Sequence, residues 1–176
     1  CLRCALPDGY RDALHILRQA APLLDHYDYQ TMIFPDFVEA YGLDDWGASL
    51  AALEQFTQQS SAEFAVRPFI EQDTAAMMAR MLEWTQHESE HLRRLASEGC
   101  RPRLPWASSL PDFKRDPGPI LPLLAQLRDD ESAYVRRSVA NNLNDIAKDH
   151  PERVISLLHD WAQDASPQRW WIIRHG

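Results

Sequence analysis

Residues His87 to His91 read HESEH and match H-E-x-x-H, the two-histidine zinc signature of many metalloproteases. In that chemistry, histidines four apart on one helix face hold the metal and the glutamate is the general base. However, Ser89 stands where a helix should begin, because a serine side chain accepts the free amide hydrogens of a first turn. His87 would then precede the helix and His91 would lie in its first turn. The sequence therefore disfavours a zinc hydrolase. A metal analysis that finds stoichiometric zinc in the wild type and its loss in His87→Ala would revive that hypothesis.

Arginines and carboxylates at helical spacing form a second group that could do chemistry. Arg94 and Glu98 stand four apart on the segment after Ser89, whose inward face is Leu92, Leu95 and Ala96. The segment after Ser132 pairs an apolar stripe (Val135, Val139, Leu143, Ile146) with a polar one (Arg137, Asn141, Asn144, Asp145, Lys148). Aligned on their serines, the two segments place Arg94 opposite Arg137 and Glu98 opposite Asn141. Such residues are either surface pairs worth a few tenths of a kcal/mol or the lining of a binding face.

The loop CRPRLPW, residues 100–106, follows the Arg94/Glu98 segment and carries two arginines and a tryptophan. Trp106 has two interpretations. It fills the gap between neighbouring helical repeats, or it places an aromatic face beside a carboxylate, as the binding of a cationic group requires.

Apolar residues recur at helical spacing along most of the chain, so we predict an all-α protein. Four serines mark expected helix starts at intervals of 28, 43 and 34 residues: Ser61, Ser89, Ser132 and Ser166. This irregular period is close to that of HEAT-type helical hairpins. The predicted fold is therefore a set of HEAT-like helical-hairpin repeats stacked into a curved α-solenoid, and the alternative is a helical bundle without a repeat.

Length and composition indicate one HEAT-like repeat domain over residues 1–176, because 45% hydrophobic and 25% charged residues are ordinary for a globular chain. The first residue is cysteine and the last glycine follows an apolar run, so we expect a fragment truncated at both ends. Neither an apolar run of about 18 residues nor a leader is present. We expect a cytoplasmic monomer without membrane contact.

The net charge of −8 disfavours a surface coated with nucleic acid, but the charge is uneven. Residues 93–137 carry 9 Lys/Arg against 6 Asp/Glu, so an acidic body bears a basic strip. The three cysteines are an odd set, and Cys1 and Cys4 have no second pair to complete a four-ligand site. We expect a reduced compartment and no metal or redox role for the Cys1/Cys4 pair.

Three blocks, SAEFAVRPF, LRRLASEGCRPRLPW and VRRSVANNLNDIAKDHP, closely resemble the bacterial AlkC-type DNA alkylation repair glycosylases of the AlkC/AlkD superfamily. The resemblance runs over roughly residues 45–175 and is weak in the first forty residues. It implies a bacterial, nucleoid-associated enzyme that excises cationic alkylated bases from double-stranded DNA, chiefly 3-methyladenine and also 3-methylcytosine. Such an enzyme would work without a metal or nucleotide cofactor.

The resemblance also implies residue roles. It matches Glu63, Glu98 and Asp145 to active-site carboxylates, with Asp145 favoured as the residue that stabilises the cationic sugar and positions water. Arg94 and Trp106 match a flanking arginine and aromatic position. The residues expected to hold phosphates are Arg101, Arg103, Arg136, Arg137 and Lys148.

The sequence departs from the family at Cys100, where threonine is more usual, and at WWIIRHG, where family members continue into further helices. The rival function is a non-catalytic HEAT-repeat module that binds DNA or protein, because a helical solenoid is mostly a binding scaffold. The two differ in whether Asp145→Asn abolishes base release.

Overall fold

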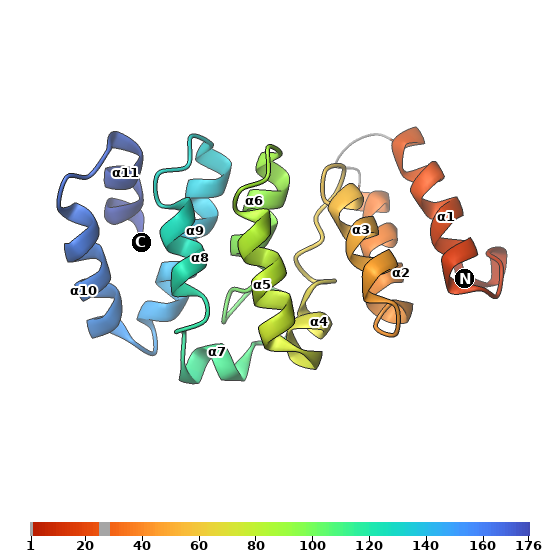
Figure 1. The fold of residues 1–176 in the computed structure, drawn as a ribbon, viewed down its shortest axis with the longest axis horizontal. Helices are drawn as coiled ribbons and strands as arrows, with labels where there is room; N and C mark the ends of the chain where they lie inside the picture. Colours follow the sequence, from red (N-terminus) through yellow and green to blue (C-terminus); the bar gives the residue numbers. More distant parts are fainter. Residues whose placement is uncertain (1, 25–28) are drawn as a thin grey trace. The chain divides into compact units, whose positions relative to one another are not determined.

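The computed structural model describes residues 2–24 and 29–176 and is all-α over that part of the chain, with short 3-10 turns and no strand (Figure 1). The predicted all-α class is confirmed. Cys1 lies outside the described residues, and Cys4 is exposed. The chain separates into two compact units, Cys1–Gln72 and Asp73–Gly176.

The first unit is built around three helices, α1 (Tyr10–Ala20), α2 (Ile33–Tyr41) and α3 (Trp46–Phe56), which pack on one another. Its shorter elements are η1 (Leu2–Ala5), η2 (Ala21–Leu23), η3 (Tyr29–Met32) and α4 (Arg67–Gln72). Aromatic and leucine side chains spaced three and four apart fill the core, including Leu14, Leu17, Phe34, Leu53 and Phe56.

The second unit contains α5 (Thr74–Trp84), α6 (Glu90–Gly99), α7 (Pro111–Arg115), α8 (Leu121–Leu127), α9 (Ala133–Ala147), α10 (Pro151–Ala162) and α11 (Pro167–His175). Helices α5/α6, α8/α9 and α10/α11 form three successive hairpins (Figure 1). The second helices of these hairpins lie side by side, because α9 packs against both α6 and α11. This is the arrangement of HEAT-like repeats.

Three of the four predicted helix starts are confirmed. Ser132 accepts a hydrogen bond from the Tyr134 amide, and Ser166 accepts one from the amide of Arg169. Ser89 occupies the residue before α6 with extended backbone, but its side chain makes no capping hydrogen bond. Ser61 was predicted wrongly, because a turn follows it and α4 begins only at Arg67.

Two helices begin instead at aspartates that the serine pattern overlooked. Asp45 accepts the Ala48 amide at the start of α3, and Asp73 accepts the Ala76 amide at the start of α5. Aspartate is as good an N-cap as serine, so helix starts in this chain follow the chemistry of the cap and not one residue type.

The interface between α6 and α9 is the apolar core that positions the candidate site. All of the predicted inward residues are buried there: Leu92, Leu95, Ala96, Val135, Val139, Leu143 and Ile146. Burying a leucine or valine of this kind stabilises the fold by about 1.5–3 kcal/mol relative to exposure. Polar residues placed on this interface are therefore held rigidly.

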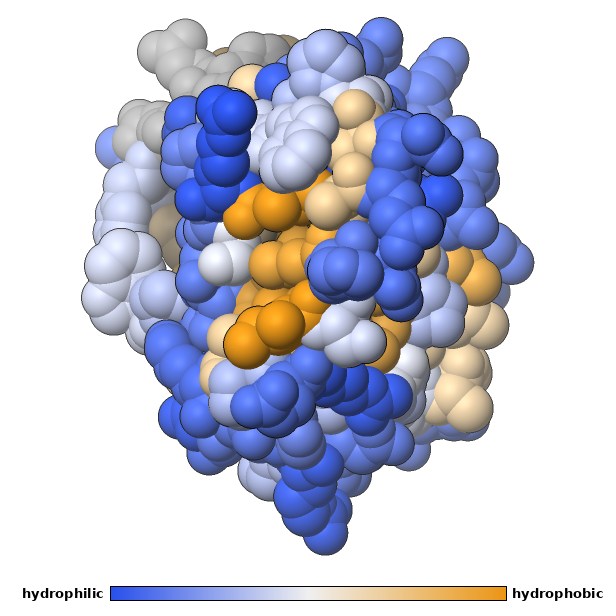
Figure 2. Space-filling model, turned by 90° about the vertical axis from the view of Figure 1, so that its left-hand side faces the viewer, coloured by the Kyte–Doolittle hydropathy of each residue, from blue (hydrophilic) through white to orange (hydrophobic). Residues whose placement is uncertain are grey.

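The outer face of α10 and α11 carries a patch of apolar side chains (Figure 2). Ile155 on α10 is 62% exposed and Trp170 on α11 is 42% exposed.

Among the helices within residues 2–24 and 29–176, none has the length and apolar character needed to cross a membrane.

Candidate active site

A buried arginine joins two carboxylates where α6 meets α9. Arg101 Nη1 donates to Glu98 Oε1 at 2.7 Å, and Arg101 Nε donates to Asp145 Oδ2 at 2.9 Å. All three side chains are less than 10% exposed. Hydrogen bonds between charged groups are about twice as strong as neutral ones, so this bridge fixes the carboxylates relative to each other.

The local chain path explains why Arg101 points inward. Helix α6 ends at Gly99, and the Arg101 amide bonds back to the Glu98 carbonyl at 3.2 Å. This turn directs the side chain toward α9 instead of into solvent. Burial disfavours the charged guanidinium, but its contacts with Asp145 and Glu98 outweigh this and raise the pKa of Arg101.

The two carboxylates differ in how their oxygens are used. Glu98 Oε2 accepts the Ser138 hydroxyl at 2.6 Å, and Glu98 Oε1 also lies 3.7 Å from Arg94 Nη2. Asp145 Oδ1 faces only the Lys148 ammonium among the described residues, at 3.4 Å, and the Lys148 side chain is 59% exposed. Asp145 therefore keeps one oxygen beside an exposed surface group, whereas both oxygens of Glu98 are held by side chains that are mostly buried.

A second polar layer lies between the same two helices. Asn142, which is fully buried, donates from Nδ2 to the Ser97 carbonyl at 2.8 Å. The buried Cys100 thiol donates to the Ala96 carbonyl at 3.2 Å. The Cys100 contact is local to the end of α6, whereas Asn142 ties that end to α9 through Ser97 and, at 3.5 Å, through the Cys100 sulfur.

The HESEH segment does not form a two-histidine helix face. Helix α6 begins at Glu90, and His87 Nδ1 instead accepts the Ser89 amide at 2.9 Å. His91 packs against Tyr134, with ring centroids 5.9 Å apart. In the described part of the chain, no three His, Cys, Asp or Glu side chains gather as a metal site.

Trp106 lies on the surface of the second unit, so it does not fill a gap between repeats. It is 98% exposed, and its φ of 63° is in the left-handed region that residues other than glycine rarely adopt. Such strained backbone persists where the surroundings impose it, commonly at functional sites. The structure brings Arg94, Glu98 and Asp145 together, while Trp106 remains free to contact another molecule.

Glu63, the remaining predicted carboxylate, belongs to the first unit. It lies in the turn before α4 and is 8% exposed. A carboxylate this deeply buried is typical of a functional or an ion-paired position.

The predicted phosphate contacts divide into two groups. Arg137 and Lys148 are exposed on α9 and after its end, as expected. Arg103 binds Asp149 in a two-pronged ion pair of 2.7 and 3.2 Å. The expected surface placement of Arg101 does not hold, because its guanidinium is buried between Glu98 and Asp145.

Arg136 is also placed differently from expectation. Its Nη1 donates to the carbonyls of Asp130 and Glu131, each at 2.8 Å, and its guanidinium lies 6.0 Å from the Trp171 ring centroid. It therefore closes the turn before α9. Arg93 does the same before α6, donating to the carbonyls of His87 and Glu88. Both arginines stand four residues after an N-terminal serine, a shared spacing that could have revealed this structural role.

The sequence reading missed Ser138 and Asn142, the two buried polar residues of α9 that bind Glu98 and Ser97. Both lie near the apolar stripe of α9, and a buried hydroxyl or amide there requires a partner. That requirement was the available signal, but the sequence does not identify the partner.

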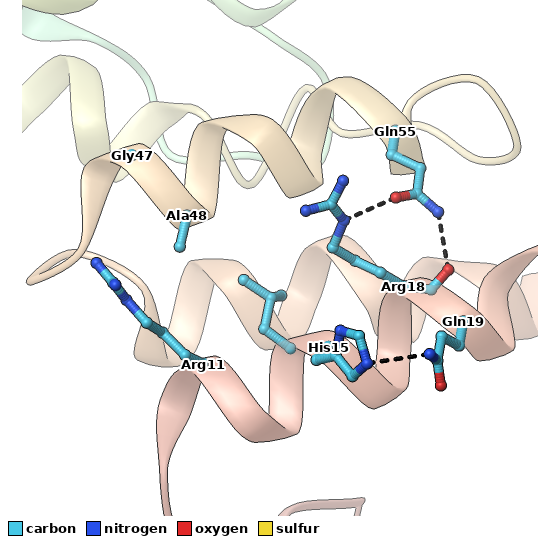
Figure 3. A pocket seen from close by; sticks show the side chains of 8 residues that line it. Arg11, His15, Arg18, Gln19, Gly47, Ala48 and Gln55 are labelled. Carbon is cyan, nitrogen blue, oxygen red and sulfur yellow. Dashed lines mark hydrogen bonds between the residues drawn. The ribbon is translucent and has the colours of Figure 1, made fainter.

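A groove of about 700 Å³ lies between α1 and α3 of the first unit (Figure 3). Arg11 pairs with Asp45 across it, and Arg18 Nε donates to Gln55 Oε1 at 2.7 Å. Gln55 returns a hydrogen bond to the Arg18 carbonyl at 2.8 Å. These contacts hold the walls of the groove together.

Helical hairpins whose second helices lie side by side, with a buried arginine bridging one carboxylate from each, define a HEAT-like repeat protein with a polar site between repeats. A family model described as DNA alkylation repair enzyme matches residues 37–171, and the chain belongs to that family. The resemblance stated from the three sequence blocks is thus confirmed.

The chain is similar to several known proteins. It is 53% identical over 171 residues to the uncharacterized protein YhaZ of Bacillus subtilis, covering 97% of this chain and 47% of that protein. It is 46% identical to the Pseudomonas fluorescens alkylpurine DNA glycosylase AlkC, solved bound to DNA containing an abasic site analog. That match has a TM-score of 0.91 and covers 97% of this chain and 47% of the other.

A more distant likeness, to AlkD2 of Streptococcus mutans, has 24% identity and a TM-score of 0.64, and covers 91% of this chain and 79% of that protein. It shows the fold alone. The chain spans about half the length of both YhaZ and AlkC.

Proposed function

We propose that this protein is a DNA glycosylase that excises cationic alkylated bases, chiefly 3-methyladenine and also 3-methylcytosine, from double-stranded DNA. The similarity to AlkC, a DNA-bound alkylpurine glycosylase, supports the reaction class. The observation that carries the proposal is Asp145, a buried carboxylate whose Oδ1 faces a single exposed cation while its Oδ2 is fixed by Arg101.

The chemistry suits this carboxylate. A 3-methylated base already bears positive charge, so its glycosidic bond breaks without a general acid to protonate the leaving base. The transition state then resembles an oxocarbenium ion, which a preorganised anion stabilises. Asp145 Oδ1 would face the cationic sugar and orient the attacking water, while Glu98 adds negative potential.

The DNA would be held by groups on the surface of the second unit. Arg137 and Lys148 are exposed and provide phosphate contacts that are independent of sequence. Trp106 offers an exposed aromatic face that can stack on a sugar or on the cationic base. Arg94 is held between Glu98 and the Tyr134 ring, 5.1 Å from its centroid, where it flanks the site.

The test is release of 3-methyladenine from methylated duplex DNA at low salt, because phosphate binding weakens steeply as salt rises. Wild type should release the base, and Asp145→Asn should not, while both bind DNA. The control is Asp149→Asn, which also removes a carboxylate from an arginine but lies on the surface. It should retain base release.

The rival function is a HEAT-repeat module that binds DNA or protein without catalysis. It predicts that folded, DNA-binding wild-type protein releases no base, and that Asp145→Asn binds DNA as wild type does. The same assay on DNA that contains 3-methylcytosine tests the second proposed substrate, because release of 3-methylcytosine is then expected.

A further inference from the structure

We propose that Arg101 is a positioning residue. Its guanidinium holds one oxygen of Glu98 and one oxygen of Asp145, so that only Asp145 Oδ1 is presented to the substrate. This inference rests on the proposed glycosylase function. It replaces the phosphate-binding role that the sequence suggested for Arg101.

Geometry separates Arg101 from the residues that touch DNA. Its side chain is 9% exposed, and its two hydrogen bonds reach helices α6 and α9 at 2.7 and 2.9 Å. A side chain this deeply buried offers little surface to a phosphate. The planar guanidinium donates in fixed directions, so it sets the orientation of the Asp145 carboxylate as well as its charge.

A cationic ligand can take the place of Lys148 at Asp145. Glu98, Arg101 and Asp145 together carry a net charge of −1, which Arg94 beside Glu98 brings to zero and Lys148 beside Asp145 brings to +1. Lys148, on the turn that follows α9, now faces Asp145 Oδ1 at 3.4 Å and is mostly exposed. A flexible surface ammonium is easily displaced, so a cationic sugar can take its place at the same oxygen.

A purely structural ion pair would be a weak explanation for this arrangement. Removing two charges from water is costly, and apolar replacements of buried ion pairs are often neutral or stabilising. Arg93 provides a local comparison. It lies on helix α6 and forms a similar buried ion pair with Asp130, which follows α8. Arg93 approaches no Asp145 oxygen, so its loss reports structure alone.

Removing the Arg101 charge should change how the two carboxylates ionise. In Arg101→Gln, Glu98 and Asp145 would share a buried space without their common cation, and one of them would retain a proton to higher pH. The remaining charges at the pair are those of Arg94 beside Glu98, Lys148 beside Asp145, and Arg103, whose charge interacts with Asp145 at longer range. These cations are more exposed and offset only part of the loss.

The first experiment measures the pH profile of kcat/KM for base release by the intact protein. In Arg101→Gln, the acid limb should move upward by about one pH unit or more, and kcat should fall about 10²-fold as the carboxylate loses its orientation. Arg101→Lys should keep the wild-type acid limb, because the charge remains, yet lose part of kcat. Arg93→Gln should lower the unfolding temperature and leave the profile unchanged.

The second measurement does not depend on catalysis. Carbon-13 NMR of the Asp145 and Glu98 carboxyl carbons reports their titration directly in wild type and in the Arg101 variants. An upward move of one titration midpoint in Arg101→Gln, but not in Arg93→Gln, supports the positioning role even if no base is released, in which case the glycosylase proposal alone fails.

Two results would overturn the inference. One is an Arg101→Gln protein whose titration midpoints and acid limb equal those of wild type. The other is an Arg101→Lys protein whose kcat and whose salt dependence of DNA binding both equal those of Arg137→Ala. That pattern would assign Arg101 to a phosphate contact. If Arg101→Gln fails to fold, Arg101→Lys carries the test through its kcat and its NMR titration.

Discussion

Arg101 Nε donates to Asp145 Oδ2 at 2.9 Å, across 44 residues of sequence. The contact links the loop after α6 to the C-terminal half of α9, and it exists only because these two helices pack side by side. It turns two carboxylates from adjacent hairpins into one fixed cluster. The chemistry proposed for Asp145 depends on that orientation.

Replacing Trp106 should separate stability from function. The side chain is almost wholly exposed, so Trp106→Ala should change the free energy of unfolding by less than about 0.5 kcal/mol. If the ring stacks on the lesion, base release should fall while the fold is retained. Thermal unfolding and base release measured on one preparation check both parts, and a large loss of stability would show that the ring packs on the protein.

The neighbouring arginines Arg136 and Arg137 should behave oppositely. Arg137→Ala should weaken DNA binding and reduce the slope of log affinity against log salt by about one, because one phosphate contact is lost. Arg136→Ala loses its bonds to two carbonyls and should cost about 1–3 kcal/mol of folding stability. Salt titrations of DNA binding and denaturant unfolding distinguish the two, and an equal change of slope in both variants would contradict this division.

The N-terminal serines of α6 and α9 should differ in their contribution to stability. Ser132→Ala removes a capping hydrogen bond to the Tyr134 amide and should cost about 1 kcal/mol, whereas Ser89→Ala removes none and should cost less. Urea unfolding of the two variants makes the comparison. Equal losses would show that Ser89 also caps its helix in solution.

Acid should weaken the attachment of α11 to the turn before α9. The Arg169 guanidinium beside Asp129 holds the pKa of that carboxyl below its ordinary 3.8, and Ser166 adds a hydrogen bond. Because the folded pKa is the lower one, the stabilisation is present above about pH 4 and is lost as pH falls through the folded pKa.

The corresponding measurement is the unfolding temperature between pH 7 and pH 2. Asp129→Asn should lower it at pH 7 and show a smaller further fall below pH 4 than wild type. Glu152→Gln, which removes an exposed negative charge from α10, should follow the wild-type curve. A wild-type curve that is flat below pH 4 would refute the contribution of Asp129.

Helix packing was largely predictable, because the periodic signal is local. The spacing of Val135, Val139 and Leu143 predicts one buried face of α9, and all three are fully buried. The serine pattern located three helix starts but failed at Ser61, where an alternative turn precedes α4. The same rule, applied to aspartate, would have found Asp45 and Asp73.

Residue roles at the site were less predictable. Arginines 93, 101, 136 and 137 look alike in sequence, yet two of them close helix turns, one bridges carboxylates and one is exposed. An arginine side chain reaches far enough to choose among several partners, so its role depends on which helices surround it. The pairing of Arg94 with Glu98 was predictable because it lies within one helix.

The sequence by itself determined the all-α class, the family and the identity of the candidate carboxylates, since these follow from local periodicity and from matching residue blocks. Only the tertiary structure decided that Arg101 lies inside and Trp106 outside, and that Asp145 keeps one oxygen beside an exposed cation. The physical reason is that burial and charge pairing arise between residues from different hairpins. Their distances are set by the packing of α6 against α9, which no local pattern specifies.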